Sequence, residues 1–177
     1  MARRKLEPQA VKILKMFHLL FAFEWIIGGV ALCFLLFITD PQTGDELYMR
    51  SIILQIVDDY CIIPGAVLAV ATGLIYNIWT HWGFFKHKWI VSKWIMAIMQ
   101  GLFGMFVLVP CIDTNVVIAD HLRDAALTDP VFLYNTQILQ IVGTIQSLFL
   151  VLVIVISVQK PWKKKKYPAY PPELPTQ

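Results

Sequence analysis

The stretch that decides the fold is MFHLLFAFEWIIGGVALCFLLFI, residues 16–38, which is apolar except for His18 and Glu24. A helix needs about 20 such residues to cross a hydrocarbon core of roughly 30 Å. A secretory signal peptide would have a shorter apolar region that is followed by a small-residue cleavage site. We therefore predict that residues 16–38 form a retained transmembrane helix.

Three further apolar runs follow, at residues 52–79, 89–110 and 132–158. The whole 177-residue chain is 58% apolar and only 15% charged, whereas soluble domains average about 25% charged residues. The longest stretch outside the runs, about Cys111 to Pro130, leaves little room for a separate soluble catalytic domain. The sequence predicts an all-α, four-helix transmembrane bundle as a single domain over residues 1–159, followed by a basic, Pro-rich tail at 160–177.

The distribution of basic residues predicts the orientation of the bundle. Positive charges accumulate on the cytoplasmic side of membrane proteins, and only Arg50 and Arg123 fall on the opposite side from the rest. We therefore predict cytoplasmic termini and a multi-pass protein of the cytoplasmic (inner) membrane. The other 13 of the 15 basic residues are Arg3, Arg4, Lys5, Lys12, Lys15, Lys86, Lys88, Lys93, Lys160 and Lys163, Lys164, Lys165, Lys166.

The net charge of +3 does not indicate a nucleic-acid partner, because the basic residues flank membrane spans. The predicted partner is the lipid bilayer. The run Lys163 to Lys166 has two possible roles: it sets the topology, or it contacts anionic lipid headgroups. No nucleotide-binding loop, HExxH or GxSxG motif occurs, so nothing favours an NTPase or a hydrolase.

Cysteines leave two alternatives open. Cys33, Cys61 and Cys111 form no CxxC motif, which argues against a thiol oxidoreductase or a zinc ribbon. Cys61 and Cys111 both lie toward the predicted outer side. They either form a disulfide there or serve as small apolar side chains in the bundle.

Ionisable groups within apolar spans are costly and mark candidate functional sites. His18 lies near the cytoplasmic start of the first span and Lys93 near that of the third, so the threading places them at similar depth. His18 is either an axial haem ligand or an interfacial histidine that hydrogen-bonds a carbonyl or headgroup. Lys93 either pairs with an acidic group of a ligand, such as a porphyrin propionate, or extends toward the headgroups.

His18 and Lys93 each begin a helix face on which small residues follow. These small residues leave room for a neighbouring backbone or a flat ligand. The spacing on each helix is 0, 4, 7 and 11 residues, which is one face of an α-helix. The two faces are His18, Ala22, Trp25, Gly29 and Lys93, Ala97, Gln100, Gly104.

Three carboxylates form a second set of candidates. Glu24 lies about 9 Å deeper than His18 by the helical rise, and it is either protonated and packed or part of a proton or cation path. Asp58 and Asp59 lie near the outer end of the second span. Together with Asp113, His121, Cys61 and Cys111 they offer oxygen, nitrogen and sulfur ligands for copper or zinc, at spacings that match no known ligand pattern.

Two stripes of residues are best interpreted as packing features. Gly65, Ala69 and Gly73 form a small-xxx-small stripe that lets helices approach closely. Gln137, Gln140, Thr144 and Ser147 give the fourth span a polar stripe, and hydrogen bonds between helices account for it.

The segment from Lys15 to Gly29, with His18, Trp25 and Gly28 in an H-x(6)-W-x(2)-G pattern, resembles the first helix of a group of small membrane proteins. The group includes bacterial haem-dependent protoporphyrinogen oxidases, the copper resistance protein D type and a family of uncharacterised four-helix integral membrane proteins. Pro64-Gly65, Thr72-Gly73 and the W-x(3)-K segment 89–93 are similar to their second and third helices. The resemblance implies that His18 is the haem-ligand position and that Lys93 is its accompanying lysine.

The chain also departs from the oxidases. They carry a Tyr and an Arg after the Trp/Gly segment, whereas residues 30–37 are apolar apart from Cys33, and their C-terminal Arg and Asn-Glu pattern is missing. The best match is the uncharacterised family, from which no activity carries over.

Two functional hypotheses follow. In the first, the chain binds b-type haem in a redox role, with His18 as ligand, Lys93 on a propionate, and Trp25, Gly29 and Gly73 around the pocket. A membrane redox partner or a homo-oligomer fits this role. In the second, it is a non-enzymatic assembly partner, or a small transport or metal-handling protein that uses Glu24, Asp58 and Asp59.

Overall fold

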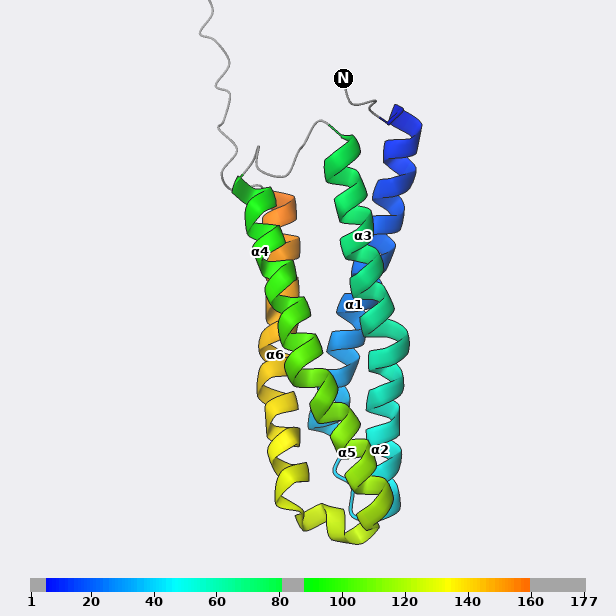
Figure 1. The fold of residues 1–177 in the computed structure, drawn as a ribbon, viewed down its shortest axis with the longest axis vertical. Coiled ribbons are helices and arrows are strands. Elements are labelled where there is room, and N and C mark those ends of the chain that lie inside the picture. The colour runs from blue at the N-terminus through cyan, green and yellow to red at the C-terminus, as the bar shows by residue number, and fades with distance from the viewer. Residues whose placement is uncertain (1–5, 81–87, 160–177) are drawn as a thin grey trace, which may run out of the picture.

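The computed structural model describes residues 6–80 and 88–159, and these residues form an antiparallel bundle of four long helices without a strand (Figure 1). All four helices are long and apolar enough to span a membrane. The predicted all-α, four-helix bundle is confirmed. The elements in chain order are α1 (Pro8–Ile38), α2 (Gly44–Val57), η1 (Asp58–Ile62), α3 (Ile63–Trp79), α4 (Lys88–Phe103), η2 (Gly104–Leu108), α5 (Val109–Leu122), η3 (Arg123–Thr128) and α6 (Pro130–Gln159).

Several predicted features lie outside the described residues. These are the tail at 160–177 with its basic run Lys163 to Lys166, the basic residues 3–5, and Lys86. We call the end of the bundle where α1 begins and α6 ends the terminal end. The opposite end, which holds residues 39–43 and η3, is the loop end (Figure 1).

The second and third helices extend further than hydropathy predicts. The second begins at Gly44 rather than Ile52, and the third continues beyond Pro110 to Thr128, so the predicted loop from about Cys111 to Pro130 is largely helical. Hydropathy marks the part of a helix that faces lipid, whereas a helix ends where its backbone is capped. The second helix has 36 residues and is roughly 54 Å long by the helical rise, so it extends well beyond a hydrocarbon core.

Each of these two long helices contains one π-helical segment followed by a proline. Pro64 lies two residues after the end of η1 and Pro110 two residues after the end of η2, each at the second position of the next α-helix. A proline inside a helix lacks its N–H, and its ring clashes with the preceding turn. The wider π turn fits at this point, so Pro64 and Pro110 are accommodated within helices that do not end there.

At the terminal end the helices form two pairs, α1 with α3 and α4 with α6 (Figure 1). Nearer the loop end the pairs join, where Cys33 Sγ lies 3.4 Å from Ser147 Oγ and Gln140 Nε2 donates to Leu36 O at 3.1 Å. The predicted polar stripe of α6 thus makes hydrogen bonds between helices through Gln140 and Ser147. Gln137 of that stripe is exposed instead.

The contact of α1 with α3 depends on two glycines. A Cβ atom added to Gly65 would lie 2.7 Å from the Trp25 backbone nitrogen, and one added to Gly28 would lie 2.7 Å from Ile62 Cγ1. Real Cβ atoms do not approach so closely, so only glycine permits this separation of the backbones. The small-residue stripe predicted from Gly65 and Ala69 therefore is the packing surface for α1.

The best-buried side chains lie toward the loop end. One apolar cluster joins α1, α2, α5 and α6, and a second joins α2, α5, η3 and α6. Between them Asn135 Nδ2 donates to Asn115 Oδ1 at 3.0 Å, and Asn115 Nδ2 donates to Thr136 Oγ1 at 3.2 Å. The two clusters consist of Leu32, Leu36, Leu54, Cys111, Ile112, Leu139 and of Leu47, Ala119, Ala126, Phe132.

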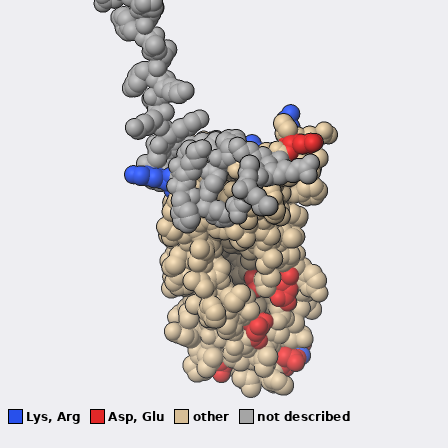
Figure 2. Space-filling view, turned by 45° about the horizontal axis from the view of Figure 1, so that its top comes forward, with Lys and Arg blue, Asp and Glu red and all other residues tan. Residues whose placement is uncertain are grey.

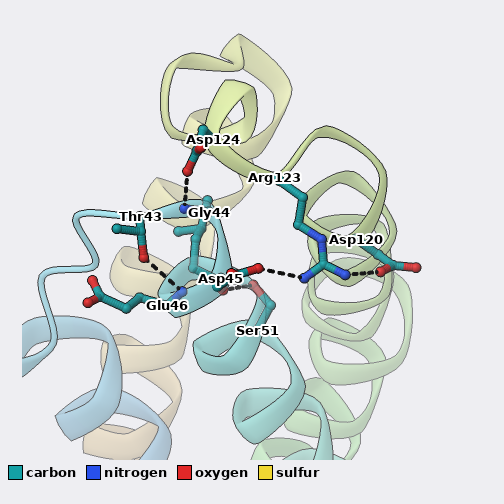
Figure 3. Close-up of polar contacts among 9 residues, drawn as sticks. Thr43, Gly44, Asp45, Glu46, Ser51, Asp120, Arg123 and Asp124 are labelled. Atoms are coloured by element: carbon teal, nitrogen blue, oxygen red, sulfur yellow. Dashed lines mark hydrogen bonds and ion pairs between the residues drawn. The ribbon is translucent and has the colours of Figure 1, made fainter.

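Arg123 holds the loop end together (Figure 3). Its φ of 46° lies in the left-handed region, which glycine normally occupies at the end of a helix. The guanidinium donates to Asp120 at 2.7 Å and to Asp45 at 3.4 Å, and it stacks on the Tyr48 ring at 4.1 Å from the centroid. Asp124 Oδ1 accepts the Gly44 N–H at 2.6 Å. These contacts hold a backbone conformation that is unfavourable for arginine.

Apolar side chains cover the flanks of the bundle, and the acidic residues in view lie mostly toward the loop end (Figure 2). Phe23, Phe34 and Leu148 are each more than 60% exposed. Exposed apolar surface of this extent indicates contact with the lipid bilayer. The fold supports a multi-pass membrane protein.

Replacing Gly65 with alanine should destabilise the bundle by about 1–3 kcal/mol, since the added methyl group overpacks against the backbone of α1. Gly143→Ala in α6 is the matched control, because a Cβ there meets nothing within 4 Å. Thermal unfolding in detergent checks this. Equal melting temperatures for the two variants would contradict the close contact.

Candidate functional site

His18 lies between α1 and α3, with one ring nitrogen hydrogen-bonded. Nδ1 lies 3.0 Å from Ala69 O and 3.1 Å from Thr72 Oγ1. A carbonyl oxygen only accepts, and the Thr72 hydroxyl donates to Leu68 O at 2.6 Å. Nδ1 therefore carries the proton and donates to Ala69, which leaves the lone pair of the neutral imidazole on Nε2.

Gly73 completes the environment of the His18 ring on the side of α3. A Cβ atom at Gly73 would lie 3.4 Å from His18 Cε1 and 3.8 Å from Nδ1. The structure therefore brings together two of the predicted pocket residues, His18 and Gly73. An alanine methyl group at position 73 would be in ordinary van der Waals contact with the ring, and a larger side chain would press on it.

Lys93 lies on α4, and its charge acts on the His18 imidazole, as the threading of antiparallel helices predicts. His18 belongs to α1 in one helix pair and Lys93 to α4 in the other. Figure 2 shows the flank of the bundle as mostly uncharged surface. Lys93 makes no hydrogen bond or ion pair with any residue that the structure describes. A cation in an apolar span without an anionic partner is costly, which marks Lys93 as a candidate ligand-binding group.

The other two predicted pocket residues lie deeper along α1. A Cβ atom at Gly29 would lie 3.2 Å from Ser147 Oγ, so this glycine faces α6. The backbone of Trp25 lies against Gly65. The structure thus places Trp25 and Gly29 at contacts between helices, about two and three helical turns beyond His18.

The three candidate carboxylates do not come together. Glu24 is half-buried on α1 and has no hydrogen-bond or ion-pair partner among residues 6–80 and 88–159. Asp58 is only 6% exposed, whereas its neighbour Asp59 is exposed. Asp58 lies near the charges of Asp59 and Asp113, and Gln55 Nε2 donates to Asp113 at 2.9 Å.

The metal site considered on the outer side does not assemble. Within the described part of the chain, no three His, Cys, Asp or Glu side chains are grouped to hold a metal ion. His121 is exposed on α5, near the loop end. The burial of Asp58 within a π-helical segment is the feature that sequence reasoning missed, and the only signal for it was the proline six residues later.

All three cysteines are free thiols: Cys111 is buried in the core, and Cys33 and Cys61 are half-buried. In the structure, Cys61 and Cys111 therefore do not form a disulfide, and they serve as small apolar side chains. Cys61 lies at the close contact with Gly28, where its Cβ would be 3.2 Å from an added methyl group.

We expect all three thiols to react with a maleimide mass tag once the chain is unfolded in SDS without reductant. The three free side chains are the physical reason. A gel shift or mass spectrum counts the tags. A single tag that rises to three after reduction would show a disulfide and contradict the structure.

Comparison with known proteins finds no match: no family model, no curated protein and no solved structure is similar enough to this chain to be reported. The resemblance to haem-dependent membrane oxidases stays a prediction that rests on His18, Trp25 and Lys93.

Proposed function

We propose that this membrane protein binds b-type haem through Nε2 of His18 and that the haem serves a redox role. The observation that carries the proposal is the hydrogen bond from His18 Nδ1 to Ala69 O, at 3.0 Å. Histidines that bind metals commonly donate their other ring N–H to a carbonyl, which fixes the tautomer and the ring orientation. The hydrogen bond from His18 Nδ1 to Ala69 O gives His18 this arrangement in the protein alone.

Lys93 supports the proposal from the opposite helix pair. Haem carries two anionic propionates, and Lys93 is a cation whose charge reaches His18 and which has no anionic partner among the described residues. A propionate at Lys93 would remove the cost of the unpaired ammonium group. The residues present at the site therefore fit the chemistry of the group.

The protein side chains have separate roles in this proposal. Ala69 orients the His18 ring, Gly73 leaves room for it, and the surrounding apolar helices exclude water. When bound, haem supplies reversible one-electron transfer at its iron. His121, the other histidine in the described residues, is exposed near the loop end, so a bis-histidine site with His18 is not part of the proposal.

The alternative hypothesis, a non-enzymatic assembly partner or a small transport or metal-handling protein, is supported by Asp58. This carboxyl group is buried in η1 and makes no hydrogen bond with a described residue. Buried carboxyl groups in membrane helices are often part of proton or ion paths. Asp59 is exposed, and no hydrogen bond links Glu24 to Asp58 among the described residues.

Replacing His18 with alanine should abolish bound haem, because the variant lacks the ligand nitrogen. The measurement is the oxidised and dithionite-reduced absorption spectrum of protein purified from a haem-replete host. His121→Ala is the matched control and should keep the Soret and α bands. Equal haem content in the His18→Ala variant would remove the assignment, and a flat spectrum of the unsubstituted protein would favour the alternative centred on Asp58.

Replacing Lys93 with methionine should weaken haem binding, whereas Lys93→Arg should retain most of it. Losing a charge-assisted hydrogen bond costs about 1.5–3 kcal/mol, which is roughly 10- to 150-fold in the dissociation constant. Titration of the apoprotein with haemin measures the change. If Lys93 only extends toward lipid headgroups, methionine and arginine variants will bind haemin as the unsubstituted protein does.

A further inference from the structure

A small cavity lined by both polar and apolar side chains lies within the loop-end core, and neither His18 nor Lys93 lines it. Its volume is about 10 Å³, and residues of α1, α2, α5 and α6 line it. The polar lining groups are Arg50 and Ser51 from α2, Asn115 from α5 and Thr136 from α6. The remaining lining is apolar. About 10–15 Å³ on this measure is the room that one water molecule needs.

Arg50 brings an unsatisfied donor to this cavity. Its Nη1 donates to Thr39 O at 3.4 Å, but its Nε is buried and donates to no acceptor among residues 6–80 and 88–159. Arg50 also forms no ion pair with a described carboxylate. A buried donor without an acceptor is costly, so the cavity should supply an acceptor.

The other polar lining groups have already used their donors. Ser51 Oγ donates to Leu47 O at 2.9 Å, and Thr136 Oγ1 donates to Phe132 O at 2.9 Å. The Asn115 amide group donates to Thr136 Oγ1 at 3.2 Å and to Phe132 O at 3.4 Å. Ser51 and Thr136 can therefore only accept further hydrogen bonds.

These free positions select the chemical class of the ligand. The lining residues offer one buried N–H without an acceptor among the described residues, the Arg50 Nε–H, together with lone pairs on the Ser51 and Thr136 hydroxyl oxygens. An anion would meet one donor and two electron-rich oxygens, whereas a water molecule accepts from the first and donates to the others. We propose that one ordered water molecule occupies this cavity and links Arg50 to the hydroxyl oxygens of Ser51 and Thr136, so that it joins α2 to α6.

The test is nuclear magnetic resonance on the full chain in nanodiscs, labelled with ¹⁵N-arginine. The chain has four arginines, so Arg50→Lys identifies the Arg50 Nε–H signal by its loss. We expect cross-peaks from this proton to water whose signs are opposite in laboratory-frame and rotating-frame experiments, as a long-lived bound water gives. Arg123, whose side chain is 41% exposed, is the internal control and should show exchange with solvent alone.

Three variants and one titration make the proposal falsifiable. Ser51→Ala should weaken the water cross-peak and Ser51→Ala combined with Thr136→Val should abolish it, whereas Thr136→Ser, which keeps the hydroxyl, should retain it. If the double variant does not fold, Ser51→Ala alone decides the test. An Arg50 signal that behaves like that of Arg123, or one that shifts saturably with added chloride and shows no bound water, overturns the proposal.

Discussion

The close contact of α1 with α3 is the constraint on which the candidate site depends. Gly28 and Gly65 let the two backbones approach until a single added methyl group would overlap atoms of the other helix. Two such contacts on one helix pair fix the rotation of each helix and their relative height. With that register, His18 reaches Ala69 O and meets Gly73 two turns beyond Gly65. A looser helix pair would leave the imidazole to hydrogen-bond with whatever lay nearest.

The two ends of the bundle are stabilised by different interactions. At the terminal end the described side chains face lipid or the partner helix, and α1 packs on α3 largely through small residues. At the loop end, Asn115 and Asn135 hydrogen-bond within the core, and Arg123 links α5 to α2. Lipid offers no hydrogen bonds, so internal polar networks and exposed ion pairs suit the end that extends beyond the hydrocarbon core.

The number, type and order of the helices could be predicted from the sequence, because long apolar runs have few other structures in a bilayer. Helix ends at the loop end could not, since Thr43 caps α2 by accepting the Glu46 N–H within a segment of ordinary polarity. The similar depth of His18 and Lys93 followed from antiparallel threading. The acceptor of the His18 proton did not, because it depends on the register between α1 and α3.

Lys93 and Arg50 are two half-buried cations, and the fold supplies a hydrogen-bond acceptor for Arg50 but none among the described residues for Lys93. Arg50 is half-buried at the loop end, where its guanidinium donates to a backbone carbonyl and its side chain lines a small cavity. Lys93 is half-buried in an apolar helix, and no described residue accepts from its ammonium group. The free energy of burying that charge is therefore offset by something other than the described protein groups. The charge of Lys93 acts on His18, and His18 Nε2 has no hydrogen-bond partner among the described residues, so the anionic, metal-binding ligand that we propose would satisfy both residues.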